Sequence, residues 1–253
     1  MTLELQKAGM WKRISAALFD LILLGIVIVG AAYLLSIVTG YDKYSQTVSD
    51  VYAHYEQQYG VTFELTQEEF DALSEEDRLR YDEAYQALCD DDEAMYAYNM
   101  LVNLTLLISS ISILIGYLLM EFTVPLLLGS GRTLGKKIFG IALMRTDGIR
   151  VTAPLMFIRT ILGKYTIETM VPVLIVIMIL FNMAGAMAVL SLGAILLLEL
   201  VVLIATRTNS LIHDLLAKTV AVDYASQRIF DSEEDLLEYK KRIHAERVAR
   251  EEY

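Results

Sequence analysis

Long apolar stretches alternate with charged segments along this chain, and their lengths predict helices that cross a membrane. Residues 14–38, 101–128 and 170–204 carry few charges. An α-helix rises about 1.5 Å per residue, so each stretch can cross a hydrocarbon core of roughly 30 Å. The third stretch, extended back to Tyr165, is too long for one crossing, and its best turn is Asn182-Met183-Ala184-Gly185. The pattern therefore predicts four transmembrane helices, at about 12–38, 99–128, 165–181 and 186–205.

The segments between these helices differ in composition and complete the expected architecture. Seven parts follow one another: transmembrane helix 1 (8–40), an acidic insert (41–98), transmembrane helix 2 (99–129), a basic loop (130–166), transmembrane helices 3 and 4 (167–206), a His-Asp motif with a strand (207–225) and a charged C-terminal helix (226–253). The expected fold class is mainly α: a polytopic membrane protein with four transmembrane helices, a cytoplasmic β-hairpin or small sheet, an interfacial helix and an acidic extracytoplasmic helical insert.

Composition supports a membrane protein, and charge orients it. Hydrophobic residues make up 55% of the 253 residues, and the mean hydropathy is +0.46, which is too apolar for an ordinary soluble domain. The net charge of −11 sums two surfaces, because segment 41–98 holds 16 acids and three bases while the remainder is slightly positive. Basic loops stay in the cytoplasm. We therefore expect the basic loop and both termini inside and the acidic insert outside.

The first residues indicate a retained signal anchor. Lys7, Lys12 and Arg13 precede an apolar run that is longer than the core of a cleavable signal peptide. No clear cleavage site of small residues follows this run. Trp11 lies where indole rings favour the membrane boundary. We expect this run to stay as the first membrane helix.

Neither cysteine chemistry nor a metal site is expected. Cys89 is the single cysteine, so an intrachain disulfide is excluded. Asp90-Asp91-Asp92-Glu93 lacks the alternating acids and the glycine of a calcium loop. A solvated acidic turn is the favoured interpretation of this run. We expect no metal and no cofactor.

The acidic insert shows helix signals that favour a packed helical cap. A helix is expected over 47–59, broken by Gly60 and followed by an extended stretch at 61–65. Thr66 and Ser74 each precede an acid by three residues, which is typical of helix starts. The tyrosines among these acids provide aromatic rings that can pack between the helices.

The basic loop carries a hairpin signal. Thr146-Asp147-Gly148 lies between the apolar runs 138–145 and 149–152, and Asp-Gly between such runs favours a hairpin. Residues 154–165 then follow the pattern of an amphipathic helix lying at the inner interface. Residues 219–224 read as a third strand able to join the hairpin.

Three acids near the cytoplasmic ends of the helices predict a polar cluster. Asp20, Glu121 and Glu199 all fall roughly 5–10 Å inside that face by helical rise. An ionised carboxylate at this depth needs pairing or hydration. The available cations are Arg13, Arg159 and Lys136. The cluster serves as a functional site or as a set of clasps that hold helix ends to the loop, and both interpretations stay open.

Two further motifs receive structural interpretations. His213-Asp214 has no accompanying nucleophile or metal set, so a structural hydrogen bond to the basic loop is favoured over catalysis. The Gly131–Lys137 turn fails as a phosphate loop, because its spacing is one residue short and no strand precedes it. Its glycines end a helix and allow close approach, and its polar side chains are candidates for contact with anionic lipid headgroups. The candidate residues of this turn are Gly131, Arg132, Thr133, Gly135, Lys136 and Lys137.

Taken together, several motifs resemble the RDD family of bacterial membrane proteins, named for one Arg and two Asp. The matching pieces are Lys12-Arg13, Phe19-Asp20, the Gly131–Ile141 stretch, Arg159 and the Leu211–Val220 stretch with His213-Asp214. The resemblance maps the Arg and two Asp to Arg13, Asp20 and Asp214 and implies a bacterial cytoplasmic membrane. The acidic insert and the C-terminal helix lie outside it, and Lys218 stands where the family often has Gly.

Two function classes follow from the sequence and the resemblance. Some family members are implicated in cation/proton exchange, and others as accessory subunits of membrane proteases or other complexes. We expect a non-enzymatic accessory, regulatory or scaffold protein with a membrane-protein partner or a homo-oligomer, and no nucleic acid. The alternative is a Na⁺/proton exchanger that uses Asp20, Glu121 and Glu199, although ion sites usually lie nearer the membrane midplane.

Overall fold

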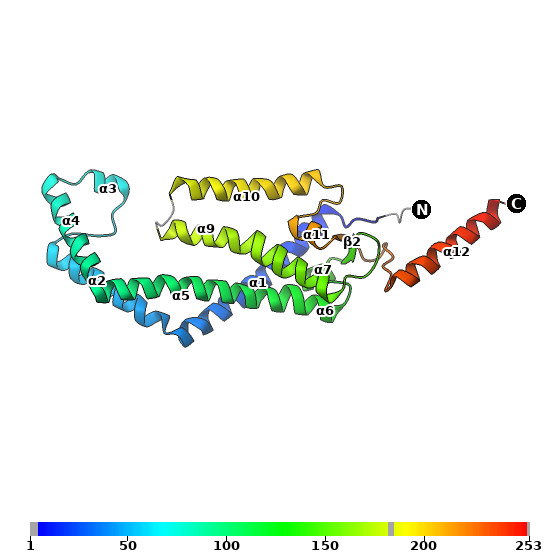
Figure 1. Ribbon diagram of the computed structural model, residues 1–253, viewed down its shortest axis with the longest axis horizontal. Helices are drawn as coiled ribbons and strands as arrows, with labels where there is room; N and C mark the ends of the chain where they lie inside the picture. Colours follow the sequence, from blue (N-terminus) through cyan, green and yellow to red (C-terminus); the bar gives the residue numbers. More distant parts are fainter. Residues whose placement is uncertain (1–4, 182–184, 252–253) are drawn as a thin grey trace. The chain divides into compact units, whose positions relative to one another are not determined.

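The computed structural model describes residues 5–181 and 185–251, which form two compact units (Figure 1). One unit contains the chain up to Ala31 together with the chain from Ser112 onward. The other contains Ala32–Ile111 and holds the acidic insert. The helices α1 and α5 each begin in one unit and end in the other. Every site below lies within a single unit.

Four helical runs are long and apolar enough to cross a membrane, as the hydrophobic pattern predicts. They are α1 (Met10–Thr39); α5 (Asp92–Gly116) continued by the π-helix η1 (Tyr117–Thr123) and α6 (Val124–Leu128); α8 (Ala153–Phe157) continued by the π-helix η2 (Ile158–Met170) and α9 (Val171–Leu180); and α10 (Ala186–Ala205). Their outward residues are largely apolar, as a lipid-facing surface requires. In the expected turn between α9 and α10, Gly185 precedes α10, and 182–184 lie outside the described residues.

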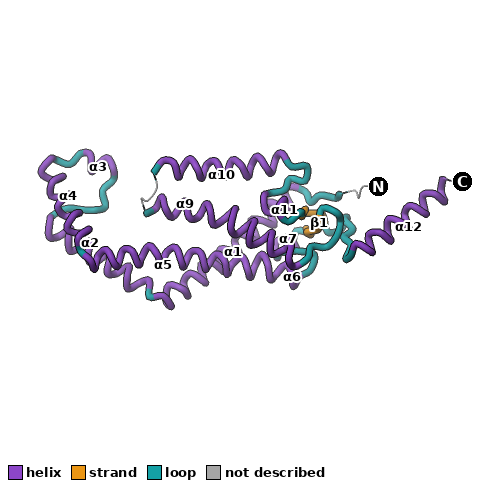
Figure 2. Tube along the Cα trace, in the orientation of Figure 1, coloured by secondary structure: helices purple, strands orange, loops and turns teal. Residues whose placement is uncertain are grey.

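The helix expected at 154–165 is present, but it is not a separate interfacial helix. It forms the first part of the continuous run from Ala153 to Leu180 (Figure 2). The amphipathic interpretation placed this helix by itself at the inner interface. The polar side chains of Arg159 and Lys164 pair with acids inside the protein, and the helix continues into the third span without a break.

A two-stranded antiparallel sheet joins β1 (Ile141–Arg145) to β2 (Thr219–Asp223), as expected for the late strand. The Asp147-Gly148 turn forms, with the Gly148 amide donating to the Arg145 carbonyl at 2.9 Å. The expected hairpin partner at 149–152 forms no extended strand: Arg150 bridges Met144 of β1, and the Arg145 amide donates to the Ile149 carbonyl at 2.8 Å. Pro154 lacks an amide hydrogen and begins a helix, so the chain leaves the sheet after two residues.

Both faces of the sheet are buried, which fixes it against the helices. Ile141 and Leu143 point to one side and pack with Met156 of α8 and Ala16 of α1. The alternate positions on β1 and β2 form a second cluster, which Leu5 covers. The N-terminal segment also bridges β2 at Lys7. Period-two alternation with apolar residues on both faces explains the complete burial.

The acidic insert is helical, as predicted. It contains α2 (Tyr41–Tyr59), α3 (Gln67–Asp71) and α4 (Glu75–Asp90). Gly60 ends α2 with a φ of 66°, a conformation that suits glycine. Thr66 and Glu69 form a capping box at α3, and Ser74 caps α4. Aromatic edge contacts link the pieces, including Phe63 with Tyr81 at 5.7 Å between ring centroids.

The acidic run at the end of this insert caps a helix. The Asp91 carboxylate accepts hydrogen bonds from the amides of Glu93 and Ala94, at 2.9 and 3.0 Å, at the start of α5. A carboxylate is favourable at a helix N-terminus, and these bonds hold the pKa of Asp91 below its usual value, against a smaller rise from burial. Across the described residues, no group of three or more His, Cys, Asp or Glu side chains is placed to hold a metal ion.

Three short or terminal helices complete the fold. They are α7 (Leu134–Ile138), α11 (Ile212–Leu216) and α12 (Glu233–Glu251). Only the first turns of α12 pack on the protein, where Leu236 meets Phe230 and Ile149. Leu237 is more than half exposed. The rest of this charged helix is therefore largely exposed.

Candidate functional site

One stripe of α1 faces the protein interior and positions the first site residues. Ala16, Asp20 and Leu24 are its buried residues, and their four-residue spacing puts them on one helix face. Leu24 packs in a cluster with Ile113 and Tyr117. Asp20 is 9% exposed, so its carboxylate requires partners from another element.

The partners of Asp20 are the N-terminal groups of α7 rather than a cation. Its Oδ1 accepts from the Gly135 amide at 2.8 Å, and its Oδ2 accepts from the Thr133 hydroxyl. The positive end of a helix stabilises an anion in this way. A Cβ built on Gly135 would lie 2.4 Å from the Ala16 carbonyl oxygen, so glycine is needed for this approach. The expected neutralisation of Asp20 by a lysine or arginine is therefore wrong.

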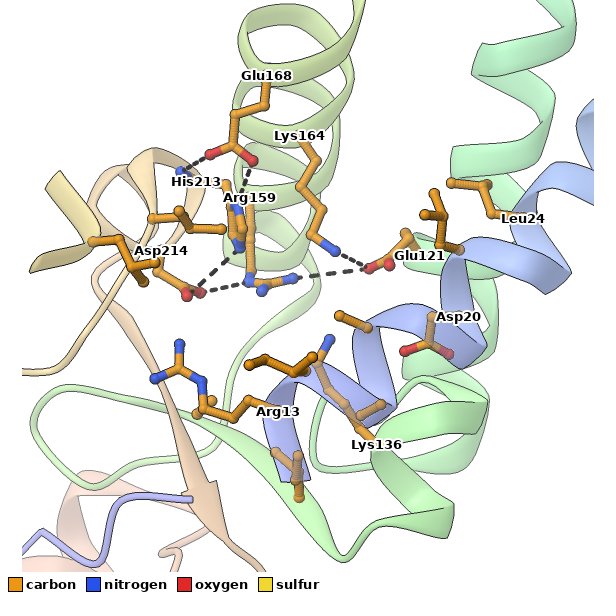
Figure 3. A pocket seen from close by; sticks show the side chains of 18 of the residues that line it. Arg13, Asp20, Leu24, Glu121, Lys136, Arg159, Lys164, Glu168, His213 and Asp214 are labelled. Carbon is orange, nitrogen blue, oxygen red and sulfur yellow. Dashed lines mark hydrogen bonds and ion pairs between the residues drawn. The ribbon is translucent and has the colours of Figure 1, made fainter. Parts of the chain in front are cut away.

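Arg159 is the centre of a buried charge network (Figure 3). It projects from η2 and is 3% exposed. Its Nε donates to Asp214 Oδ1 at 2.9 Å, and its Nη1 lies 4.0 Å from Glu121 Oε2. Thr219 of β2 donates a second bond to Asp214. Burial raises the pKa of Asp214, but Arg159, His213 and Thr219 together outweigh it and hold that pKa below its usual value.

A second ion pair extends the network to η1. Lys164 Nζ lies 2.8 Å from Glu121 Oε2, and Glu121 is 6% exposed. The Thr160 hydroxyl donates to the Glu121 backbone carbonyl at 3.0 Å. The network therefore joins η1 to η2 by both side-chain and backbone contacts.

His213 makes the structural hydrogen bond expected for it, with an unexpected partner. The Glu168 carboxylate accepts from the His213 amide at 2.8 Å and lies 2.6 Å from His213 Nδ1. Burial lowers the pKa of His213 more than Asp214 and Glu168 raise it. Because an ionised carboxylate can only accept, Nδ1–H donates to Glu168. Gly163 permits this packing, since a Cβ there would lie 2.5 Å from His213 Cβ.

The sequence interpretation missed Glu168 and did not assign Lys164 to the site. Glu168 lies four residues after Lys164, at the start of an otherwise apolar helix. An acid at the end of a membrane span is the same signal that selected Asp20 and Glu121. Applied to every span, that criterion would have found it.

Arg13 joins the first span to the loop after the fourth. Its guanidinium donates to the carbonyls of Thr208 and Asn209, at 3.2 and 2.7 Å. It lies on the same side of the site as Asp214 (Figure 3). Two donated bonds from a fixed fork hold this loop against α1.

We expect Arg13→Ala to destabilise the protein by about 1.5 kcal/mol, the low end for hydrogen bonds from a charged group, because Arg13 is only half-buried. Thermal unfolding in detergent measures the change. Lys7→Ala is the matched control, since Lys7 makes one exposed bond to the Arg207 carbonyl of the same loop. Equal melting temperatures for the two variants would contradict a clasp role for Arg13.

The three acids predicted to converge do line one pocket. Its volume is about 430 Å³, and Asp20, Glu121 and Glu199 all border it. Lys136 enters it from α7, and Arg159 enters it from η2 (Figure 3). Within the described residues, Glu199 makes no hydrogen bond or ion pair. We call this space the charged pocket.

The remaining residues of the Gly131–Lys137 turn serve the fold. A Cβ on Gly131, whose φ is 59°, would lie 2.9 Å from Leu143 Cβ. Arg132 donates to the carbonyls of Leu128 and Gly129 at the end of α6, where a cation is favourable. Thr133 caps α7. Lys137 is exposed.

Four apolar spans clasped to a small sheet by buried charges define a polytopic helical membrane protein. The profile of the RDD family matches residues 7–218, so the chain belongs to the RDD family. No curated protein and no solved structure gives a match. The match begins at Lys7 in the N-terminal segment and ends at Lys218, just before β2. It therefore covers the helices that carry the charged side chains of the site.

Proposed function

We propose that this chain is a non-enzymatic accessory, regulatory or scaffold protein of a membrane complex. We place it in a bacterial cytoplasmic membrane with the sheet and both termini in the cytoplasm and the acidic insert outside. The basic loop beside the sheet supports this orientation by its charge. The observation that carries the proposal is the pairing of the buried charges with one another.

The carboxylates of the network already pair with groups inside the protein, although Glu121 Oε2 meets Lys164 as an ion pair without a hydrogen bond. Glu121 has Lys164, Asp214 has Arg159 and Thr219, and Glu168 has His213. A transported ion would have to displace these partners, and breaking a buried pair leaves an uncompensated charge at a cost of roughly 3–5 kcal/mol. Such a network supports a fixed scaffold better than a transport site.

Two exposed elements are suited to contact with other proteins. The acidic insert combines 16 acids with surface tyrosines. Beyond its first turns, α12 is mostly exposed and carries both signs of charge. Charged surfaces of this kind favour specific partners through electrostatic complementarity.

We expect the full-length chain, purified from native membranes in mild detergent, to bring down one membrane partner repeatedly. One of two deletions, of residues 41–98 or of α12, should abolish that capture, because one of these elements supplies the docking surface. Glu238→Gln on exposed α12 is a control for charge loss at one position, and each variant is checked for folding by thermal unfolding. Recovery of the chain without any specific partner would contradict the proposal.

Cation/proton exchange is the second candidate, and a specific observation favours it. Asp20, Glu121 and Glu199 border one pocket, and Glu199 has no hydrogen-bond partner among the described residues. A sodium-dependent pH change in proteoliposomes, abolished by Asp20→Asn or Glu199→Gln in folded protein, would establish exchange and overturn the scaffold role.

A further inference from the structure

The charged pocket contains a buried hydrogen-bond donor without an acceptor. Arg159 Nη1 is fully buried and makes no hydrogen bond within the described part of the chain. Its nearest carboxylate oxygen, on Glu121, lies at 4.0 Å, beyond hydrogen-bonding distance. A buried guanidinium N–H without a partner costs free energy, so this nitrogen is suited to an acceptor from outside the chain.

Lys136 supplies a second unused cation. Its side chain points into the space near Arg159 and Glu121 (Figure 3). Within the described residues, its ammonium makes no hydrogen bond or ion pair. Burial lowers the pKa of Lys136 to about 8; Glu121 opposes this, and Lys164 and Arg159 lower it further. Lys136 therefore lies near two like charges, Lys164 and Arg159, as well as near the Glu121 carboxylate.

The acids nearest these two cations are already engaged. Glu121 pairs with Lys164, Asp214 pairs with Arg159 through Nε, and Asp20 accepts from Gly135. None of them hydrogen-bonds Arg159 Nη1 or Lys136 Nζ within the described chain. Glu121 Oε2, which is also buried without a hydrogen-bond partner, forms only a 4.0 Å ion pair with Arg159 Nη1. An acceptor that carries negative charge and reaches both nitrogens would complete these two donors.

The size and lining of the charged pocket indicate the chemical class of its ligand. A volume of about 430 Å³ greatly exceeds the roughly 30 Å³ of one water. Leu21, Leu24 and Leu203 border the same pocket as the cations. Leu21 is 62% exposed on α1, so the apolar lining continues onto the lipid-facing surface.

We propose that the charged pocket binds a phosphate oxyanion, received by Arg159 Nη1 and Lys136 Nζ. A phospholipid headgroup supplies this group with acyl chains along the apolar lining, and free phosphate supplies it alone. This site differs from the headgroup contacts expected for the surface of the basic loop, because Lys136 turns inward while Lys137 stays exposed. It does not depend on the accessory role.

The test compares two neighbouring lysines in full-length, delipidated protein. Binding of dioctanoyl phosphatidylglycerol is measured by titration calorimetry, and native mass spectrometry counts the bound lipids. Wild type and the control Lys137→Gln should bind one lipid with equal affinity. Lys136→Gln should weaken binding about tenfold, as expected for the loss of one charge-assisted bond. Lys136→Arg should restore most of the affinity, and thermal unfolding checks that each variant is folded.

Two further ligands distinguish the source of the phosphate. Inorganic phosphate that binds with the same dependence on Lys136 would support the site and assign it to the free anion. Lipid that binds while inorganic phosphate does not would support the site and assign it to the headgroup. The proposal is overturned if dioctanoylglycerol, which lacks phosphate, binds equally well. It is also overturned if no ligand saturates, or if Lys136→Gln and Lys137→Gln behave alike.

Discussion

Asp214→Ala is expected to lower the free energy of unfolding by about 3–5 kcal/mol, because it leaves Arg159 as an uncompensated buried cation. Both side chains are 3% exposed, and their bond from Nε to Oδ1 measures 2.9 Å. The change also removes the acceptor for the Thr219 hydroxyl, so β2 loses its tie to η2. Thermal and chemical unfolding in detergent measure the loss.

Asp231→Ala is the matched control for this prediction. Asp231 also pairs with an arginine, Arg150, at 3.2 Å, but its side chain is 78% exposed. Exposed ion pairs contribute little to stability, so this variant should unfold at the wild-type temperature. Similar melting temperatures for the two variants would show that the buried pair does not hold the fold together.

Gly163→Ala is expected to destabilise the protein by roughly 1–3 kcal/mol or more, as overpacking of a tight contact does. A Cβ at Gly163 would lie 2.5 Å from His213 Cβ and 2.6 Å from His213 Cα. Because one of these atoms belongs to the backbone, a side-chain rotation cannot relieve the contact. The helix η2 and α11 must separate, which weakens the bonds between Glu168 and His213. The melting temperature in detergent and the yield of folded protein measure the effect.

Gly193→Ala tests whether the effect comes from contact rather than from glycine itself. Gly193 lies in α10, and a Cβ there would meet nothing within 4 Å. Alanine is favoured over glycine inside a helix by about 1 kcal/mol, so this variant should match or exceed wild-type stability. Equal loss in the two variants would refute the close packing of η2 on α11.

Hydrophobic patterning was sufficient to predict the spans. The fourth helix runs from Ala186 to Ala205, as the length of the apolar stretch predicted. The sheet was less predictable, since the Asp147-Gly148 turn forms but β1 pairs with β2, about 75 residues further along the chain. Local turn chemistry identifies a reversal, whereas the choice of strand partner depends on tertiary packing.

The site was predicted in part. Residue type and depth correctly placed Asp20, Glu121 and Glu199 around one pocket. The partners of Asp20 were not predictable from charge, because one of them is the backbone amide of Gly135, a group that every residue except proline carries. Glu168 was not predicted, although it is an acid at the end of an apolar span, as Asp20 and Glu121 are.

The wide turn of η2 decides which of its charges can act together. Arg159 and Glu168 are nine residues apart, which is two and a half turns of an α-helix, so an α-helix would point them in opposite directions. A π-helix closes its bonds from residue i to i+5, as the Val171 amide does to the Thr166 carbonyl. Each turn then holds about one residue more, and nine residues make roughly two full rotations. Both side chains consequently project the same way, one reaching Asp214 and the other His213. The π-helical turn of η2 thus allows two of its residues, nine positions apart, to contact two neighbouring residues of α11.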